Sequence, residues 1–397
     1  MKVIDETQTV VIGAGAVGTA IAYFLARRGA DVVLVDRGPV CGETSAATVA
    51  LVWVQSKAPA HYTRLSLLSS NLYAAISPEL DEDVEFRRPG GIQLALNDQE
   101  VEVLVRRAEV QNQVEGLNVQ ILDGDAVRRV EPAVGPDVVG GSYCPWDGHV
   151  HSLAYVHALA RGARRRGARI RTFTAVTDIL RDGGGAASGV VTSAGVIRTR
   201  NVVDAAGVSS GLIAHMVGVK VPIVPCRGEV VVSEPLPPLV SRPLHLIRQS
   251  PTTGIFLFGE THAFTGLDRT STPQAIRHNA QRAIKLIPAL RHAQALRVFV
   301  GLRPWPPDGL PFLGPVPRVP GFYVAVGHSG ITLSPGYGKI VSDLILDGRT
   351  DVDLSPYDPC RYEDRDEVTI KAGTHAVTIP MKGPRWPEVL VEKPAAA

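Results

Sequence analysis

The hydrophobic and polar positions at the start of the chain predict a strand, a helix and a second strand. Residues 10–12 form an apolar run typical of a buried strand, and apolar residues then recur at helical spacing across 20–25. Gly29 ends the helical pattern, and the β-branched run 31–35 leads directly into Asp36. The opening of the chain therefore predicts a β-turn-α-β unit.

Glycines fill the turn of this unit in dinucleotide-binding spacing. Gly13, Gly15 and Gly18 follow the first strand as G-x-G-x-x-G. Glycine there permits a tight turn, a close approach of the backbone to a pyrophosphate and close helix packing. The helix N-terminus adds free N–H groups and partial positive charge. Asp36, at the end of the second strand, is placed to accept hydrogen bonds from a ribose and argues against a 2′-phosphate.

Further along the chain, two kinds of pattern alternate. Helices are predicted at 61–76, 99–115, 153–166, 273–287 and 336–346. Strands are predicted at 169–173, 176–180, 189–192, 228–233, 254–258, 296–300 and 322–326. Together they indicate an α/β fold in which a Rossmann-type domain is interleaved with a second α+β domain built on a mainly antiparallel sheet. The predicted division is 1–83, 148–218 and 302–353 for the first domain, 84–147 and 219–301 for the second, and 354–397 as a C-terminal extension.

Composition excludes several classes of protein. A chain of 397 residues is long enough for two domains, and a formal net charge of +2 gives no reason to expect nucleic acid or an anionic membrane as partner. The 4 cysteines form no C-x-x-C pair, so neither a metal site nor a disulfide framework is indicated. We expect a cytoplasmic protein without a membrane span, because no apolar run approaches the roughly 18 residues that a span requires.

Four further segments point from a dinucleotide in general to a flavin. Segment 44–48 reads TSAAT, and 202–210 reads VVDAAGVSS, whose small residues permit a close backbone approach. Segment 301–314 reads GLRPWPPDGLPFLG and holds an arginine among glycines and prolines. Segment 322–346 reads FYVAVGHSGITLSPGYGKIVSDLIL, a strand, a glycine-rich turn and a helix.

With the opening fingerprint, these segments resemble the D-amino-acid-oxidase-like flavoproteins, the family of glycine oxidase, monomeric sarcosine oxidase and the flavin subunits of opine and hydroxyproline dehydrogenases. The likeness covers about residues 8–350. It implies that the first domain binds FAD and that the second holds the substrate. No cysteine lies between Cys226 and Cys360, so we expect non-covalent FAD. The residues expected to bind it are Gly13, Gly15, Ala16, Val17, Gly18, Asp36, Arg37, Thr44, Ser45, Ala46, Ala47, Thr48, Val176, Ala206, Gly207, Gly301, Arg303, Gly327, His328, Ser329, Gly330, Ile331 and Thr332.

The same resemblance implies three catalytic side chains. Arg303 stands where glycine oxidase grips the substrate carboxylate, and a guanidinium fork suits that task. His245 and His262 stand where glycine oxidase carries a tyrosine and a methionine, so we expect a more polar, titratable pocket. The alternative for either histidine is a solvated position in a loop.

The implied reaction is oxidation of an amino acid or N-substituted amine to an imine, by hydride transfer from Cα to flavin N5. The imine then hydrolyses to a 2-oxo acid. Oxygen or an acceptor protein would reoxidise the flavin, and a homo- or hetero-oligomer is compatible with the family. The alternatives are the flavin subunit of a multisubunit opine- or hydroxyproline-type dehydrogenase, a flavin enzyme acting on a hydroxy compound, and a non-enzymatic FAD-carrying subunit for assembly or electron relay.

The extension beyond Leu354 lies outside the region of resemblance. Prolines interrupt it, and only 376–379 and 389–391 have the pattern of short edge strands. Its apolar residues favour ordered docking of part of the segment, either along the first domain or on another subunit, over complete disorder.

Overall fold

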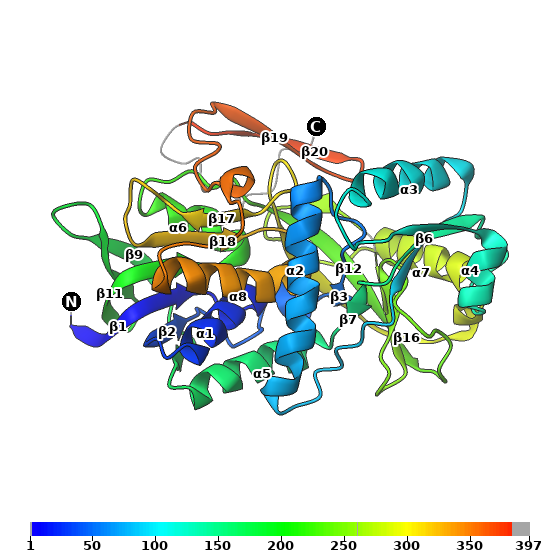
Figure 1. Cartoon of the computed structure of the whole chain (residues 1–397), viewed down its shortest axis with the longest axis horizontal. Coiled ribbons are helices and arrows are strands. Elements are labelled where there is room, and N and C mark those ends of the chain that lie inside the picture. Colours follow the sequence, from blue (N-terminus) through cyan, green and yellow to red (C-terminus); the bar gives the residue numbers. More distant parts are fainter. Residues whose placement is uncertain (1, 260, 383–397) are drawn as a thin grey trace.

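The computed structural model describes residues 2–259 and 261–382, which fold around two main sheets lying side by side (Figure 1). Helices pack on the sheet that contains the N-terminal strand, and the second sheet carries the other helices. Within the described residues, no helix has the length and apolar character needed to cross a membrane.

The first sheet is the predicted Rossmann-type sheet. Its main path runs β17-β18-β11-β1-β2-β8, and β1 pairs in parallel with both β2 and β11. β8 extends this parallel arrangement, as the predicted second α-then-β unit requires. The strands are β1 (Val3–Ile12), β2 (Val32–Val35), β8 (Arg169–Arg171), β9 (Val176–Arg181), β10 (Ala187–Thr192), β11 (Gly195–Asp204), β17 (Phe312–Pro315) and β18 (Phe322–Val326).

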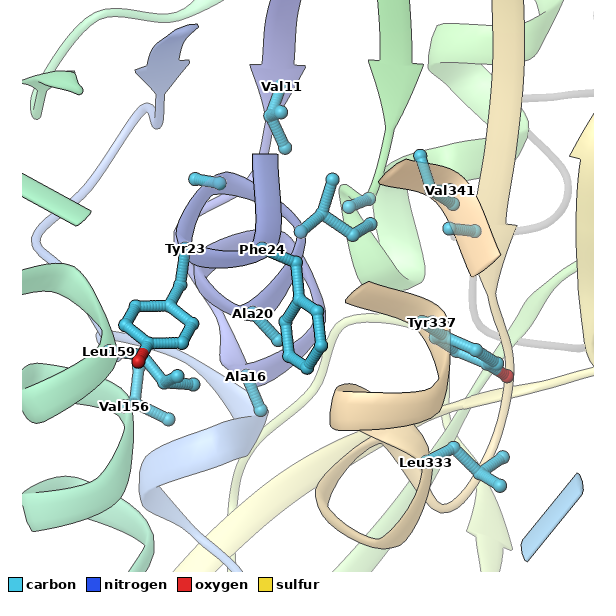
Figure 2. Packing of buried hydrophobic residues seen from close by; sticks show 14 of the residues in the cluster. Val11, Ala16, Ala20, Tyr23, Phe24, Val156, Leu159, Leu333, Tyr337 and Val341 are labelled. Atoms are coloured by element: carbon cyan, nitrogen blue, oxygen red, sulfur yellow. The ribbon is translucent and has the colours of Figure 1, made fainter. Parts of the chain in front are cut away.

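Four helices pack together against one face of this sheet. They are α1 (Ala16–Arg27), α2 (Ala60–Ile76), α5 (Ser152–Arg165) and α8 (Gly330–Leu346), while α6 (Ser210–His215) contacts β11 and β18. Figure 2 shows Tyr23 and Phe24 of α1 directed toward α5 and α8 respectively. A Cβ on Gly338 would lie 2.5 Å from the Phe24 ring, so only glycine lets α8 approach α1 this closely.

The second sheet is mainly antiparallel, as predicted. β12 pairs with β14, β15 and β16, and the three strands β4-β6-β5 join this group through a bridge between Ile92 and Leu244. The strands are β4 (Gly91–Ala95), β5 (Gln120–Asp123), β6 (Gly140–Cys144), β12 (Val224–Pro235), β13 (Ile247–Gln249), β14 (Ile255–Phe258), β15 (Ala263–Phe264) and β16 (Ala295–Trp305). Its helices are α3 (Asp98–Gln111), α4 (Gly124–Val130) and α7 (Pro273–Leu286).

Short elements lie between the longer helices and strands. Strands β3 (Leu51–Val52) and β7 (Gly148–His149) form a two-stranded sheet. Single 3₁₀ turns lie at η1 (Thr44–Ala46), η2 (Ser77–Leu80), η3 (Gly207–Ser209), η4 (Pro288–His292) and η5 (Ser355–Tyr357).

The helix predicted at 336–346 begins six residues earlier than expected. Pro335 has no N–H to donate to the carbonyl of Ile331, which is the usual reason for a helix to start after a proline. Here the hydroxyl of Tyr73 donates to that carbonyl at 2.5 Å, and the hydroxyl of Ser334 donates to it at 3.1 Å. One tertiary hydrogen bond, from Tyr73, and one local bond, from Ser334, therefore replace the missing one, and α8 continues back to Gly330.

Strand β16 is longer than its predicted range of 296–300. It pairs with β12 as far as Trp305, opposite Val224, so the GLRPW motif lies in a strand of the second sheet. The proposed boundary at 301/302 thus falls inside β16. The division of the chain into segments stays a prediction.

The C-terminal extension forms a β-hairpin that packs on the second sheet. β19 (Glu367–Ala372) pairs with β20 (His375–Pro380), and their buried side chains contact Val224 and Trp305. The indole Nε1 of Trp305 donates to the carbonyl of Lys371 at 2.8 Å. The strand predicted at 389–391 lies outside the described residues.

Truncation after Asp366 is expected to lower the melting temperature by roughly 5 °C while FAD stays bound, because the apolar face around Val224 and Trp305 loses its cover. Thermal melting followed by flavin fluorescence measures both quantities. A truncation after Lys382 is the matched control, since it keeps β19 and β20. An unchanged melting temperature after the longer deletion would show that the hairpin contributes nothing to stability.

Candidate active site

A cavity of about 430 Å³ lies between the two parts of the molecule, within the usual range of roughly 300–1,000 Å³ for ligand sites. Of the predicted cofactor-binding residues, those lining it are Gly13, Gly15, Ala16, Val17, Asp36, Arg37, Thr44, Ser45, Ala47, Thr48, Val176, Ala206, Gly207, Gly301, Arg303, Gly327, His328, Ser329, Gly330, Ile331 and Thr332. Gly18 and Ala46 do not line it. The segments singled out in the sequence therefore meet at one cavity.

The nucleotide fingerprint is packed too tightly for side chains. Gly13 has φ +108°, and a Cβ there would lie 2.4 Å from the carbonyl oxygen of Ala205. A Cβ on Gly18 would lie 1.8 Å from the carbonyl oxygen of Gly13, so Gly18 serves helix packing. The Asp36 carboxylate accepts from the amide of Ala14 at 2.6 Å, which fixes the acid beside the glycine turn.

The opposite wall also brings backbone close to the cavity. A Cβ on Gly301 would lie 2.6 Å from the carbonyl oxygen of Ala47. The hydroxyl of Thr44 donates to the carbonyl of Leu302 at 2.5 Å, and that of Ser45 accepts from the amide of Ala16 at 3.0 Å. FAD needs glycines that let the backbone approach closely, N–H donors at a helix N-terminus, and a carboxylate that accepts from the ribose hydroxyls. The cavity offers all three, so these residues fit the cofactor.

Arg303 extends from β16 over β12. A Cβ on Gly228 would lie 1.9 Å from Nη1 of Arg303, so the guanidinium rests directly on that glycine. Nη1 donates to the carbonyl of Thr261 at 2.9 Å. No carboxylate of the described residues forms an ion pair with it, and burial lowers the pKa of the guanidinium. Since arginine remains protonated in proteins, the guanidinium brings to this cavity a positive charge without a carboxylate partner among residues 2–259 and 261–382.

Replacing Gly228 with alanine is expected to lower kcat/KM for a carboxylate substrate about 10- to 100-fold, because the new Cβ displaces the guanidinium. FAD content should remain that of the wild type. Gly183→Ala is the control, since a Cβ at Gly183 meets nothing within 4 Å. Equal kinetics for both variants would mean that the contact between Gly228 and the Arg303 guanidinium is not needed for catalysis.

The predicted histidines do not share one environment. His245 lines the cavity, with its ring centroid 5.6 Å from that of Trp53, and burial with nearby Arg107 lowers its pKa to about 3. His262 does not line the cavity; its ring lies edge-on to Trp305 at 5.4 Å.

The ring of His328 lies 4.5 Å from that of Trp305 on the cavity side, and burial lowers its pKa well below the ordinary value. Trp305 thus connects the C-terminal hairpin with a ring in the cavity wall.

Sequence reasoning missed Lys57, Trp53 and Asp147. Lys57 and Trp53 line the cavity, and burial lowers the pKa of Lys57 to about 8. Asp147 is completely buried and accepts from the amide of Val54 at 2.5 Å and from the side chain of Gln55 at 2.7 Å, which fixes the loop before Lys57. The available signal was a lysine three residues after the apolar run 49–54.

The fold and this cavity together define a two-domain dinucleotide-dependent oxidoreductase. The chain belongs to the FAD dependent oxidoreductase family, whose model matches residues 8–344. The predicted family and its FAD cofactor are therefore confirmed.

One curated relative and two solved structures match along almost their whole length. The chain is 30% identical over 378 residues to an opine oxidase subunit of Rhizobium meliloti, covering 90% of this chain and 98% of that protein. The crystal structure of glycine oxidase from Geobacillus kaustophilus has a TM-score of 0.84 and 29% identity, over 90% of this chain and 99% of that one. That of L-proline dehydrogenase from P. horikoshii has a TM-score of 0.84 and 27% identity, over 90% and 98%.

Proposed function

We propose that this enzyme oxidises an amino acid or N-substituted amine at its Cα–N bond, giving an imine that hydrolyses to a 2-oxo acid. The observation that carries the proposal is the Arg303 guanidinium, which lines the cavity without a described carboxylate partner. Glycine oxidase and L-proline dehydrogenase, both named for amino-acid substrates, support it.

Bound FAD supplies a hydride acceptor at N5. Arg303 binds the substrate carboxylate and orients the Cα–H, so that positioning is the main catalytic device. The free N–H groups at the start of α8, in Gly330–Thr332, stabilise negative charge on the cofactor side of the cavity. His245 is neutral, so it contributes a hydrogen-bonding surface rather than charge.

Cofactor attachment is proposed to be non-covalent. Among the described residues no cysteine lines the cavity, and Cys41, Cys144 and Cys226 are buried free thiols. Free thiols also support the cytoplasm, a reducing compartment, as the location.

The decisive experiment mixes the purified protein anaerobically with a panel of D-, L- and N-substituted amino acids while flavin absorbance is followed. Bleaching by at least one amine, with FAD released on acid precipitation, is the expected result. Bleaching by a hydroxy acid and by no amine would replace the proposal with alcohol oxidation.

The rate of anaerobic flavin reduction is expected to show no histidine ionisation between about pH 5 and pH 7. A lowered pKa keeps a ring neutral at every pH above it, and burial lowers the pKa of His245 to about 3 and that of His328 well below its usual range. The logarithm of kcat/KM should therefore rise steadily as the substrate amine loses its proton. An inflection near pH 6.5 that His245→Asn removes would contradict this.

A second candidate function is that of a flavin subunit in a larger assembly. The opine oxidase relative and the hydrogen cyanide synthase relative HcnC of Pseudomonas aeruginosa are both named as subunits, which favours it. Turnover of an amine with oxygen by the isolated chain would support a self-sufficient oxidase. Flavin bleaching without aerobic turnover would support a subunit that passes electrons to a partner.

A further inference from the structure

Besides Arg303, and Arg37, which pairs with Glu43, the cavity is lined by a third cation, Lys57. Only 7% of Lys57 is exposed, and its ammonium group donates to the hydroxyl of Ser329 at 2.8 Å and to that of Ser56 at 3.1 Å. An ammonium carries three N–H donors, so one remains for another acceptor.

The buried charge of Lys57 has no direct counter-ion among the described residues. The hydrogen-bond partners of Lys57 are neutral hydroxyls. Asp147 attracts it electrostatically, but the Asp147 carboxylate accepts its hydrogen bonds from Val54 and Gln55. Buried charges are normally paired, because desolvating an unpaired one costs several kcal/mol. An anionic ligand that reached the ammonium group of Lys57 would therefore stabilise its buried charge.

Lys57 and Arg303 reach the cavity from different elements. Lys57 follows β3, in the loop that Asp147 fixes, whereas Arg303 lies in β16 of the second sheet. The electrostatic influence of both cations reaches His328, whose Nδ1 lies 3.0 Å from the hydroxyl of Ser329. The cavity thus contains two separate positive groups near one ring.

We propose that Lys57 binds a second acid group of the substrate, so that the preferred substrates are amines carrying two carboxylates, one held by Arg303 and one by Lys57. This inference rests on the proposed amine oxidation and narrows it to a substrate class. It assigns Lys57 to specificity, since its ammonium contacts a group of the substrate remote from the reacting Cα–N bond.

Two pairs of ligands that differ by one carboxylate test the proposal. Sarcosine and iminodiacetate are the oxidisable pair, and (methylthio)acetate and thiodiacetate are the matching pair that cannot be oxidised at nitrogen. For wild-type holoenzyme, calorimetry is expected to give tighter binding of thiodiacetate than of (methylthio)acetate. Lys57→Met should weaken thiodiacetate about 10- to 100-fold and leave (methylthio)acetate unchanged, as the loss of one charged hydrogen bond predicts. Lys57→Arg should restore most of the preference.

Arg107→Met is the matched control. Arg107 is a partly buried cation that donates to the side-chain oxygen of Gln93 at 3.1 Å and acts electrostatically on Lys57 and His245, but it does not line the cavity. Its loss should leave the ratio of the two dissociation constants unchanged. Equal weakening of both ligands by Lys57→Met, or the same change in ratio with Arg107→Met, would overturn the inference.

The two proposals fail in different ways. If no amine bleaches the flavin, the proposed function is wrong. If sarcosine and iminodiacetate both bleach it and Lys57→Met changes their kcat/KM by the same factor, amine oxidation stands and the role of Lys57 in specificity is wrong.

Discussion

Replacing Arg303 with leucine is expected to lower kcat/KM for a carboxylate-bearing amine by a factor corresponding to about 2–5 kcal/mol, which is roughly 30- to 5,000-fold. The guanidinium is the cavity group that pairs with the substrate carboxylate, and without it that carboxylate is desolvated against an apolar side chain. FAD should remain bound, because the residues expected to hold its nucleotide part are the glycine turn between β1 and α1 and Asp36. Stopped-flow reduction and the flavin-to-protein absorbance ratio give the two quantities.

Lysine at the same position is not expected to restore the rate. An ammonium is a point charge and cannot form the planar fork that binds a carboxylate through two parallel hydrogen bonds. An amine substrate esterified at its carboxylate is the internal control, and its rate should be similar in wild type and Arg303→Leu. Wild-type kinetics in Arg303→Lys would place the carboxylate site elsewhere in the cavity.

Alanine at Gly18 is expected to abolish FAD retention during purification and to destabilise the protein by about 3 kcal/mol, the upper end of ordinary overpacking. A Cβ there would lie 1.8 Å from the carbonyl oxygen of Gly13, which belongs to the turn itself and cannot rotate away as a side chain would. The start of α1 must therefore move away from the pyrophosphate position. The absorbance ratio of flavin to protein and a melting curve in excess FAD measure both effects.

Gly29→Ala is the control for the effect of an added methyl group. Gly29 has φ +79°, but a Cβ there meets nothing within 4 Å, so only backbone strain of about 1 kcal/mol is expected. Normal FAD content in Gly29→Ala together with flavin-free Gly18→Ala would locate the effect in the contact with Gly13. Normal FAD content in both variants would contradict the prediction.

The local parts of the fold could be predicted from sequence because their signals lie within a few residues. The strand at 10–12, the helix at 20–25 and the turn at Gly13 belong to one continuous unit, and its signals, the apolar spacing and the glycine spacing, lie in consecutive residues. The predicted cofactor is confirmed by the family model, and the predicted fold class by the likeness to glycine oxidase.

The contacts that complete the site come from distant parts of the chain, and their sequence signals are weak. Lys57 meets Ser329, and Asp147 meets Val54, although no periodicity connects the members of either pair. Burial then changes the chemistry, because it lowers the pKa of His245 to about 3, far from the ordinary histidine that the sequence suggests. Such effects require the tertiary neighbours to be known.

Local signals were also overridden by tertiary contacts. Pro335 predicts that a helix begins after it, but the hydroxyl of Tyr73, from another helix, bonds the orphaned carbonyl of Ile331. Likewise, the prolines that follow Arg303 suggest a loop, yet pairing with β12 keeps the segment as far as Trp305 in a strand.

The order of β1, β11 and β18 along the chain has a consequence for biosynthesis. Val10 of β1 pairs with Val202 of β11, and Val202 pairs in turn with Phe322 of β18. β1 leaves the ribosome first but cannot pair with β11 until that strand has been synthesised much later. A nascent chain that ends before β18 leaves one edge of β11 without its neighbouring strand. We expect FAD to associate only with chains whose translation is almost complete, and stalled or fragmentary chains to depend on chaperones to stay unaggregated.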